Sequence, residues 1–447
     1  MAAAAATAVV LGSGCARNAE EDVVEVWTMG SEGEVVETML PAFAERHPQV
    51  PVRVQRLPWS AAHEKLLTAY VGRTMPDVFQ IGNTWIPEMV ALGALEPLDE
   101  RASESSSVAP RDYFAGILDT NVVDGRLHAL PWYVDTRLLF YRRDLLTRAG
   151  VAATPATWPQ WLEAMRAVRE RAGENGYAIF LPVDEWQTPV ILALQHGARL
   201  LRDDDSFGNF RSAEMKAAMT LYLSLYENDF APQRAAAQIA NLYQEFAAGY
   251  FAIFITGPWN LRELARRLPA DLATAWTTSP MPGMGSGLAI EHSHAAHRQA
   301  SPAESATTPG VSLAGGASLA IASSSKRKDA AWKLLEFLAE PAQQAAFYRA
   351  SGSLPARRST WNDAALADDE TAHAFRVQLE HVVPTPKIPE WERIASKVSL
   401  HVERMVRGDV TLEQGLADLD ADVDAILAKR RWLMGRMPSG TVSDMNR

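Results

Sequence analysis

The chain has 447 residues, which is more than one hydrophobic core usually takes, so we expect two lobes or domains. Its hydrophobic content of 47% and charged content of 22% are typical of a soluble globular protein. The net charge of −11 argues against nucleic acid or an anionic membrane as a partner, and no internal apolar run reaches the roughly 18 residues that predict a transmembrane helix.

The first apolar segment covers residues 2–11 and is followed by small residues and by the single cysteine, Cys15, which excludes an intrachain disulfide. This segment resembles a lipoprotein signal, in which the cysteine becomes the lipidated first residue of the mature protein. It departs from that pattern at Gly12, where leucine is usual, and in lacking a Lys or Arg before the apolar run. The resemblance implies a lipid anchor at Cys15 within a signal and linker segment of residues 1–20. The alternative is an Ala-rich tail with an incidental cysteine.

Strand and helix patterns alternate from residue 23 onward. Strands are expected over residues 23–27, 50–54 and 76–81, and helices over residues 36–43, around 66–70 and from Pro87. This alternation predicts a parallel sheet with helices on its faces. Ligands of such sheets lie beyond the carboxyl ends of the strands, which is where loops 30–33 and 82–85 fall.

A break in regular structure follows at residues 131–137. Pro131 lacks a backbone N–H, which favours a bend or a sheet edge, and the apolar run 138–141 predicts a short strand. Between them lie Trp132, Tyr133, Asp135 and Arg137. Two aromatic residues and an opposite-charge pair at such a break are typical of a binding site. The alternative is a capped strand with a surface ion pair.

The second half of the chain also contains predicted helices and strands. Helices are expected over residues 158–171 and 215–226 and from Asp329, and strands over residues 177–181, 251–255 and 315–321. Residues 275–282 are interpreted as a second crossing between lobes, and residues 283–310 as a low-complexity insert. Thr411 and Gln414 form a capping-box pattern that opens a last amphipathic helix, with Leu416, Leu419, Val423 and Ile426 on one face.

Four motifs occur in order along the chain. They are Asp124-Gly125-Arg126 through Leu130-Pro131 and on to Tyr141-Arg142-Arg143-Asp144-Leu145; Gly257-Pro258-Trp259 after an apolar strand; Gly315-Gly316-Ala317-Ser318 before a helix; and the Leu-Pro-x-Arg turn of residues 353–357. Together they resemble the bacterial extracellular sugar-binding proteins that feed ABC importers. The resemblance covers most of residues 23–427.

This resemblance implies an α/β fold of the two-lobed periplasmic-binding-protein type II, with a ligand cleft between the lobes that closes by hinge motion. Lobe 1 would comprise residues 21–135 plus 281–345, and lobe 2 residues 136–280 plus 346–435, followed by a tail of residues 436–447. The hinges would lie near residues 135–137, Pro280 and Ala345.

The implied function is that of an extracytoplasmic, periplasmic subunit that captures a mono- or oligosaccharide and presents it to an inner-membrane ABC permease. Loops 30–33 and 82–85 look most like those of the subgroup that handles α-glucosides such as maltose or trehalose. The resemblance implies a monomer that has no cofactor and touches the membrane only through the possible lipid anchor.

A sugar ring presents C–H faces to aromatic rings and hydroxyls to carboxylates and amides, so its site needs both kinds of group. The predicted ligand-binding residues are Glu32, Asn83, Thr84, Trp85, Trp132, Tyr133, Asp135, Glu185, Trp186, Trp259, Gly316, Arg357 and Trp391. Trp259 and Trp186 are expected to stack on the ligand, and Asp135 and Glu32 to accept hydrogen bonds from its hydroxyls. The indoles of Trp132, Trp186 and Trp259 should therefore lie together at the cleft. For Arg357 a solvated turn residue is an equal alternative.

An extracellular glycoside-active enzyme is the alternative function, because such enzymes also use carboxylates, held at a set separation across one bond. His292, His294 and His297 beside Glu291 have side chains that ligate transition metals. They lie in a Gly- and Ser-rich segment without flanking elements to fix a second shell, so we interpret them as a solvated loop and predict no metal site.

Overall fold

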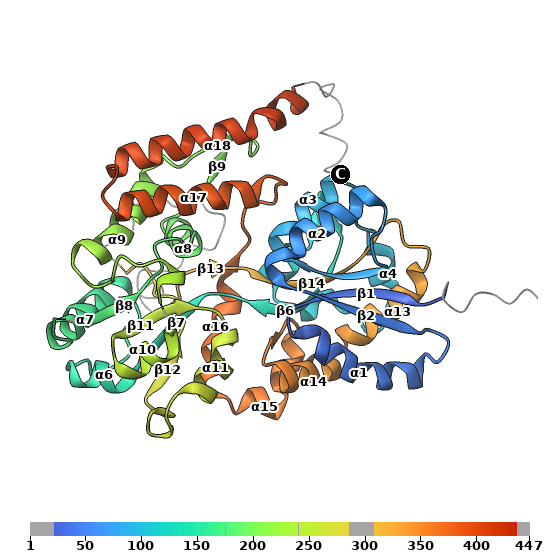
Figure 1. Ribbon diagram of the computed structural model, residues 1–447, viewed down its shortest axis with the longest axis horizontal. Coiled ribbons are helices and arrows are strands. Elements are labelled where there is room, and N and C mark those ends of the chain that lie inside the picture. Colours follow the sequence, from blue (N-terminus) through green and yellow to red (C-terminus); the bar gives the residue numbers. More distant parts are fainter. Residues whose placement is uncertain (1–21, 175, 240, 286–307, 436–447) are drawn as a thin grey trace, which may run out of the picture.

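Two lobes lie side by side in the computed structural model, each built on its own β-sheet (Figure 1). The structure describes residues 22–174, 176–239, 241–285 and 308–435. Cys15, the histidines of the insert and the tail of residues 436–447 lie outside this range. No helix in the described ranges is long and apolar enough to cross a bilayer.

Lobe 1 contains a six-stranded mixed sheet in the order β15-β6-β14-β3-β1-β2. Strands β1, β2 and β3 pair in parallel. Strand β14 pairs antiparallel with β3, β6 with β14, and β15 with β6. The bounds are β1 Val24–Met29, β2 Val52–Leu57, β3 Val78–Gly82, β6 Leu130–Asp135, β14 Gly315–Ile321 and β15 Leu354–Pro355. The predicted alternation of strand and helix over the first ninety residues is confirmed.

Helices cover both faces of this sheet because its central strands are buried on both sides. Figure 1 shows α2 and α3 on one side and α1 and α14 on the other. The helical bounds are α1 Glu32–Arg46, α2 Trp59–Gly72, η1 Asn83–Trp85, α3 Ile86–Ala91, α4 Asp99–Glu104, α13 Lys328–Ala339 and α14 Pro341–Ser351. The smaller elements are η2 Pro110–Asp112, α5 Ala115–Asp119, β4 Val122–Val123, β5 Arg126–Leu127 and η5 Arg358–Asn362.

Lobe 2 contains a four-stranded sheet in the order β12-β7-β11-β8. Within this sheet the neighbours β11 and β8 pair in parallel, and the other neighbours pair antiparallel. The bounds are β7 Leu138–Arg142, β8 Tyr177–Phe180, β11 Phe251–Thr256 and β12 Trp276–Ser279. Short pairs of strands complete the lobe: β9 Leu201–Arg202 with β10 Phe207–Gly208, and β13 Ser312–Leu313 with β16 Val382–Val383.

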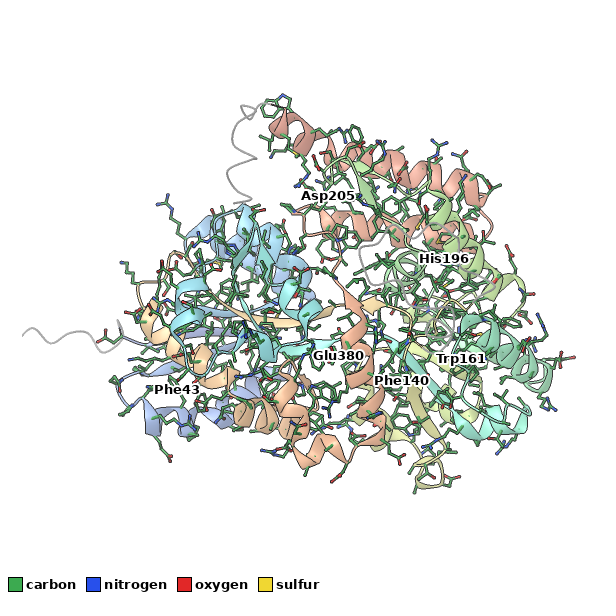
Figure 2. All side chains as sticks on the ribbon, turned by 180° about the vertical axis from the view of Figure 1, so that it is seen from behind. Phe43, Phe140, Trp161, His196, Asp205 and Glu380 are labelled. Carbon is green, nitrogen blue, oxygen red and sulfur yellow. The ribbon has the colours of Figure 1, made fainter. Side chains whose placement is uncertain are left out.

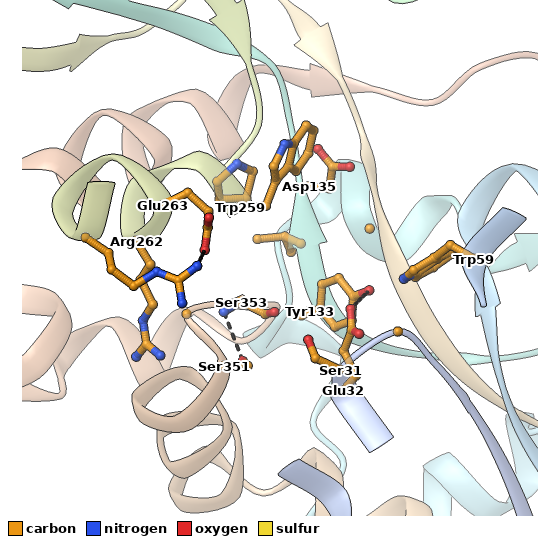
Figure 3. Close-up of a pocket in the computed structure, with 16 residues that line it drawn as sticks. Ser31, Glu32, Trp59, Tyr133, Asp135, Trp259, Arg262, Glu263, Ser351 and Ser353 are labelled. Atoms are coloured by element: carbon orange, nitrogen blue, oxygen red, sulfur yellow. Dashed lines mark hydrogen bonds and ion pairs between the residues drawn. The ribbon is translucent and has the colours of Figure 1, made fainter. Parts of the chain in front are cut away.

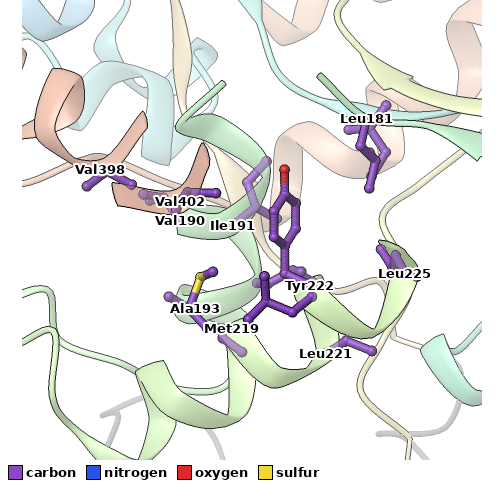
Figure 4. Packing of buried hydrophobic residues seen from close by; sticks show 14 of the residues in the cluster. Leu181, Val190, Ile191, Ala193, Met219, Leu221, Tyr222, Leu225, Val398 and Val402 are labelled. Atoms are coloured by element: carbon purple, nitrogen blue, oxygen red, sulfur yellow. The ribbon is translucent and has the colours of Figure 1, made fainter. Parts of the chain in front are cut away.

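Lobe 2 has one large apolar core, formed by α6, α7, α8, α9, α17 and α18, while α10, α11, α15 and α16 pack into a separate apolar cluster. Their bounds are α6 Arg143–Arg148, α7 Trp158–Arg171, α8 Gln187–Gln195, α9 Ala213–Glu227, α10 Leu242–Ala248, α11 Trp259–Arg267, α15 Ala364–Ala367, α16 Glu370–Gln378, α17 Trp391–Val406 and α18 Leu412–Met434. Tyr222 is fully buried in this core between residues of α8, α9 and α17 (Figure 4). The last helix starts as predicted, since the Thr411 hydroxyl accepts a hydrogen bond from the Gln414 amide at 3.2 Å.

A third cluster of apolar residues joins the lobes. Val134 of lobe 1 and Phe140 of lobe 2 belong to this junction core, whereas Phe43 and Trp161 mark the separate cores of lobes 1 and 2 (Figure 2). The shared core packs the two lobes against each other on the side where the chain crosses between them.

The first crossing lies where it was predicted, between β6 and β7. The sheet register shifts opposite Pro131, between Ala317 and Ser318, and β15 pairs only with residues 133 and 134 of β6. Pro131 therefore lies at an irregular and partly unpaired position, in keeping with its missing N–H.

The other two predicted crossings are wrong. Residues near Pro280 continue β12, an edge strand of lobe 2, and Gly283 then bridges to Thr157 of the same lobe. The chain returns to lobe 1 at Ala314, between β13 and β14. Ala345 is buried within α14, and β15 still pairs with lobe 1, so the third crossing follows η5.

Candidate functional site

Two neighbouring cavities lie between the lobes. The larger has a volume of about 780 Å³ and the smaller about 190 Å³. Trp59, Asp135 and Gly316 line both, so the cavities form one continuous cleft. The walls come from the end of β6 and the starts of β14, α1 and α2 in lobe 1, and from the start of α11 in lobe 2 (Figure 3).

Glu32 lines the larger cavity from the first position of α1. The Tyr133 hydroxyl donates a hydrogen bond to Glu32 Oε1 at 2.9 Å and accepts one from Gln80 Nε2 at 3.0 Å. Burial raises the pKa of Glu32 above its usual value, although hydrogen bonds from Tyr133 and Trp59 oppose the rise. The carboxylate is thus held in one orientation while part of it still faces the cavity.

Asp135 ends β6, at the crossing itself. Arg137 Nη1 donates to Asp135 Oδ1 at 3.2 Å. Burial raises the pKa of Asp135 more strongly than Arg137 lowers it. The opposite strand can approach because Gly316 has a φ of 137° and its missing Cβ would lie 2.2 Å from the Tyr133 carbonyl oxygen.

Trp259 is the first residue of α11 and is 47% exposed, which makes it one of the largest apolar surfaces left open in lobe 2. Gly257 lets the indole fold back over the backbone, since a Cβ there would lie 1.9 Å from the ring. The Arg137 guanidinium lies 4.4 Å from the ring centroid, a cation–π distance. Arg137 therefore contacts both the carboxylate of Asp135 and the indole of Trp259.

The smaller cavity lies between aromatic residues of both lobes. Trp59 and Trp85 of lobe 1 pack edge to face with centroids 5.9 Å apart, and Trp186 faces them from lobe 2. Polar residues also line this cavity: Asn83, Thr84, Asp135, Thr136, Arg137, Gln187, which is the first residue of α8, and Thr385.

Most of the predicted ligand-binding residues are brought together here. Those that line one or both cavities are Glu32, Asn83, Thr84, Trp85, Tyr133, Asp135, Trp186, Trp259 and Gly316. Glu185 lines neither cavity but lies within electrostatic range of Arg137 and Asp135, and burial raises its pKa. The ligand-binding roles of all these residues stay predictions.

Three predicted residues are placed elsewhere, and these predictions are corrected. Trp132 is 2% exposed and packs on Phe347 in the core of lobe 1, with ring centroids 4.4 Å apart. Trp391 is fully buried behind Trp186 in the core of lobe 2. Of the three indoles expected together at the cleft, only those of Trp186 and Trp259 line it.

Arg357 is also buried and does not reach the cleft. It donates to Asp112 Oδ2 at 2.7 Å and to the carbonyl oxygen of Ala339 at 3.0 Å. Its guanidinium therefore holds the loop of residues 107–112 against the end of α13. Arg357 is therefore neither a ligand contact nor a solvated turn residue.

The sequence reasoning missed several residues of the larger cavity, above all Trp59, Arg262, Arg266 and residues 351–353. Arg262 of α11 donates three hydrogen bonds of 2.6–2.8 Å to the last carbonyls of α14 and so joins the two lobes at the cavity wall. Gly352 makes room for it, because a Cβ there would lie 2.5 Å from Arg262 Cδ. The sequence could have indicated Trp59 as a cleft residue, because it follows the carboxyl end of the parallel strand β2 as Trp85 follows that of β3.

No group of His, Cys, Asp and Glu that could hold a metal ion occurs among the residues that the structure describes. Glu291 and the three histidines of the insert fall outside those residues. The chemistry that the cleft itself offers is apolar contact with indole rings together with hydrogen bonding to carboxylates and amides.

The sequence matches the family described as bacterial extracellular solute-binding protein over residues 28–345. The structure is similar to that of the sugar-binding protein MalE from the phytopathogen Xanthomonas citri, with a TM-score of 0.85 and 44% identity, covering 93% of this chain and 100% of that one. The diacetylchitobiose binding protein DasA of Streptomyces coelicolor is 26% identical over 83% of this chain and 82% of its own length. The galactooligosaccharide-binding protein of Bacillus subtilis is 24% identical over 88% and 86% of the respective chains.

Proposed function

Because this chain belongs to the bacterial extracellular solute-binding proteins, we propose that it captures a carbohydrate in the cleft between its lobes and delivers it to an ABC importer. The observation that carries the proposal is the pairing of the exposed Trp259 indole with the carboxylates of Glu32 and Asp135 around one cavity. The indole offers the flat apolar face that a sugar's C–H groups need. The carboxylates offer acceptors for its hydroxyls.

The names of its relatives support a sugar over other solutes but differ in the sugar. One is called a sugar-binding protein, one binds diacetylchitobiose and one galactooligosaccharide. We propose an α-glucoside such as maltose or trehalose, supported by the likeness of loops 30–33 and 82–85 to the subgroup that handles them.

The cleft is proposed to bind its ligand without altering it. The carboxylates of Glu32 and Asp135 are each engaged by a neighbouring side chain, Tyr133 and Arg137 respectively. We further propose a monomer in the periplasm or outside the cytoplasm, anchored through Cys15, with an inner-membrane permease as its partner.

A thermal-shift panel of mono-, di- and trisaccharides tests the proposal. A ligand at about a hundred times its dissociation constant stabilises the folded state by roughly 2.7 kcal/mol. Amino acids and small anions are the matched negative set. A panel in which no sugar raises the melting temperature would contradict the proposal. Release of glucose from maltose or trehalose would instead favour the glycoside-active alternative.

A further inference from the structure

Gln80 is a polar side chain in the middle of β3, a strand whose residues are all buried. Gln80 is itself fully buried, and it lines neither of the two cavities. A buried amide costs free energy unless both its donor and its acceptor are paired. Both are paired here, and the partners, Met29 and Tyr133, connect Gln80 to the wall of the larger cavity.

The direction of each hydrogen bond around Gln80 follows from its partners. The backbone N–H of Met29 can only donate, so the Gln80 atom 2.7 Å away from it is the carbonyl oxygen Oε1. The NH₂ group then faces the Tyr133 hydroxyl and donates to it at 3.0 Å. Because this hydroxyl has a single proton, the proton goes to Glu32 Oε1, which lies 2.9 Å away. Glu32 therefore acts as an acceptor at Oε1.

These hydrogen bonds close a ring around the loop between β1 and α1. Met29 ends β1 and Glu32 begins α1, and the two residues are joined through Gln80 of β3 and Tyr133 of β6. Two residues lie between them and line the larger cavity: Gly30 and Ser31. The ring thus fixes a segment of the cavity wall to two strands of the lobe 1 sheet.

The surroundings of Glu32 leave its carboxylate little room to turn. Glu32 and Tyr133 lie next to each other at one wall of the cavity (Figure 3). Gly30 has a φ of 62°, and a Cβ there would lie 2.7 Å from Glu32 Oε2 and 3.2 Å from Trp59 Nε1. The second carboxylate oxygen therefore lies on the side of Trp59, while the first is held by Tyr133.

We propose that Gln80 is a positioning residue for sugar binding, which orients the Tyr133 hydroxyl so that Glu32 is presented to the cavity as an acceptor. This inference rests on the proposed function, in which Glu32 accepts a hydrogen bond from a ligand hydroxyl. It adds a buried residue outside both cavities on which the strength of that hydrogen bond depends. Burial raises the pKa of Glu32 and the hydrogen bond from Tyr133 opposes the rise, so the same hydrogen bonds favour the ionised acceptor.

A double-mutant cycle tests the proposal, with affinities measured by titration calorimetry for maltose or for the disaccharide that gives the largest thermal shift. Gln80→Met keeps a similar shape but removes the donor and the acceptor. We expect it to weaken binding by about three- to tenfold in the wild-type background. In the Glu32→Ala background the same substitution should change the affinity by less than about twofold, because the group through which it acts is gone. Thermal shifts at high sugar concentration extend the measurement to weakly binding variants.

Gln378→Met is the matched control. Gln378 is also fully buried, accepts a hydrogen bond from the Met281 N–H at 2.7 Å and donates to two backbone carbonyl oxygens at 3.0 Å. It lines neither cavity. Gln378→Met should therefore lower the melting temperature as Gln80→Met does, because each leaves a buried N–H unpaired, but it should leave the sugar affinity unchanged.

A second variant replaces Gln80→Met if that protein does not fold. Tyr133→Phe interrupts the same hydrogen bonds without emptying the core, and it should weaken binding in the wild-type background and not further in Glu32→Ala. A loss in Glu32→Ala as large as the loss in wild type, or no loss in wild type, would show that Gln80 is structural only, and the inference would be wrong although sugar binding stands. If wild type binds no sugar, the proposed function fails, and the inference with it.

Discussion

Replacing Trp259 with alanine is the most direct test of the cleft. A tryptophan side chain can bury up to about 250 Å², and 47% of this residue is exposed, so a ligand could cover at most about 120 Å². At about 25 cal/mol per Å² the full area corresponds to about 3 kcal/mol, and one face of the ring to about half of that. We therefore expect Trp259→Ala to weaken sugar binding by about ten- to a hundredfold.

Isothermal titration calorimetry with the sugar that gives the largest thermal shift would measure the loss. Trp259→Phe is the control, because it keeps an aromatic face and should retain most of the affinity. The melting temperature without ligand should change little, since the indole is half exposed and makes few core contacts. Equal affinities of wild type and Trp259→Ala would refute the assignment of this indole as a stacking surface.

Three other predictions follow from the placement of single residues. Trp132→Ala should lower the free energy of unfolding by about 3–5 kcal/mol, because it empties a core site, while the folded fraction keeps its sugar affinity; denaturant unfolding and calorimetry measure the two. Arg357→Ala should cost about 3 kcal/mol of stability by leaving partly buried acceptors unpaired, again without a change in affinity, and a large loss of affinity would contradict its structural role. Burial raises the pKa of Glu32 and Asp135, so these groups take up protons at a higher pH than usual, and hydroxyl donors that prefer the carboxylate form should bind more weakly as pH falls through the raised pKa values. Dissociation constants measured from pH about 7.5 to about 4.5 should rise in wild type and rise less in Glu32→Gln.

The fold could be predicted because its signals are local. Alternating strands and helices in the first ninety residues, and a glycine-rich strand at residue 315, each depend on short stretches of sequence. The crossings between lobes depend on which strand pairs with which. For example, β15 pairs with β6 although more than two hundred residues separate them in the sequence, and no local sequence pattern predicts this pairing.

The sequence patterns around Trp132 and Trp391 already indicated that these two side chains could lie in the core. Alternation along a strand would place Trp132 on the face of β6 away from Tyr133 and Asp135. In the structure the rings of Trp132 and Tyr133 both pack against Phe347, and of the two only Tyr133 lines the cleft. Trp391 begins the buried stripe of α17 that continues with Ile394 and Val398, which is a core pattern. Arg357 had no such signal, because its partner Asp112 lies 245 residues away along the chain.

The first crossing holds cleft-lining groups of the two lobes in fixed positions without a ligand. Asp135 ends β6, the strand of lobe 1 that leads into the first crossing, and Arg137 follows two residues later. The Arg137 guanidinium contacts both the Asp135 carboxylate and the Trp259 indole of lobe 2. A rotation about this crossing moves the acid and the indole only as far as the arginine allows. Because a preorganised site loses less free energy on ordering, we expect this arrangement of Asp135, Arg137 and Trp259 to favour binding of the proposed sugar.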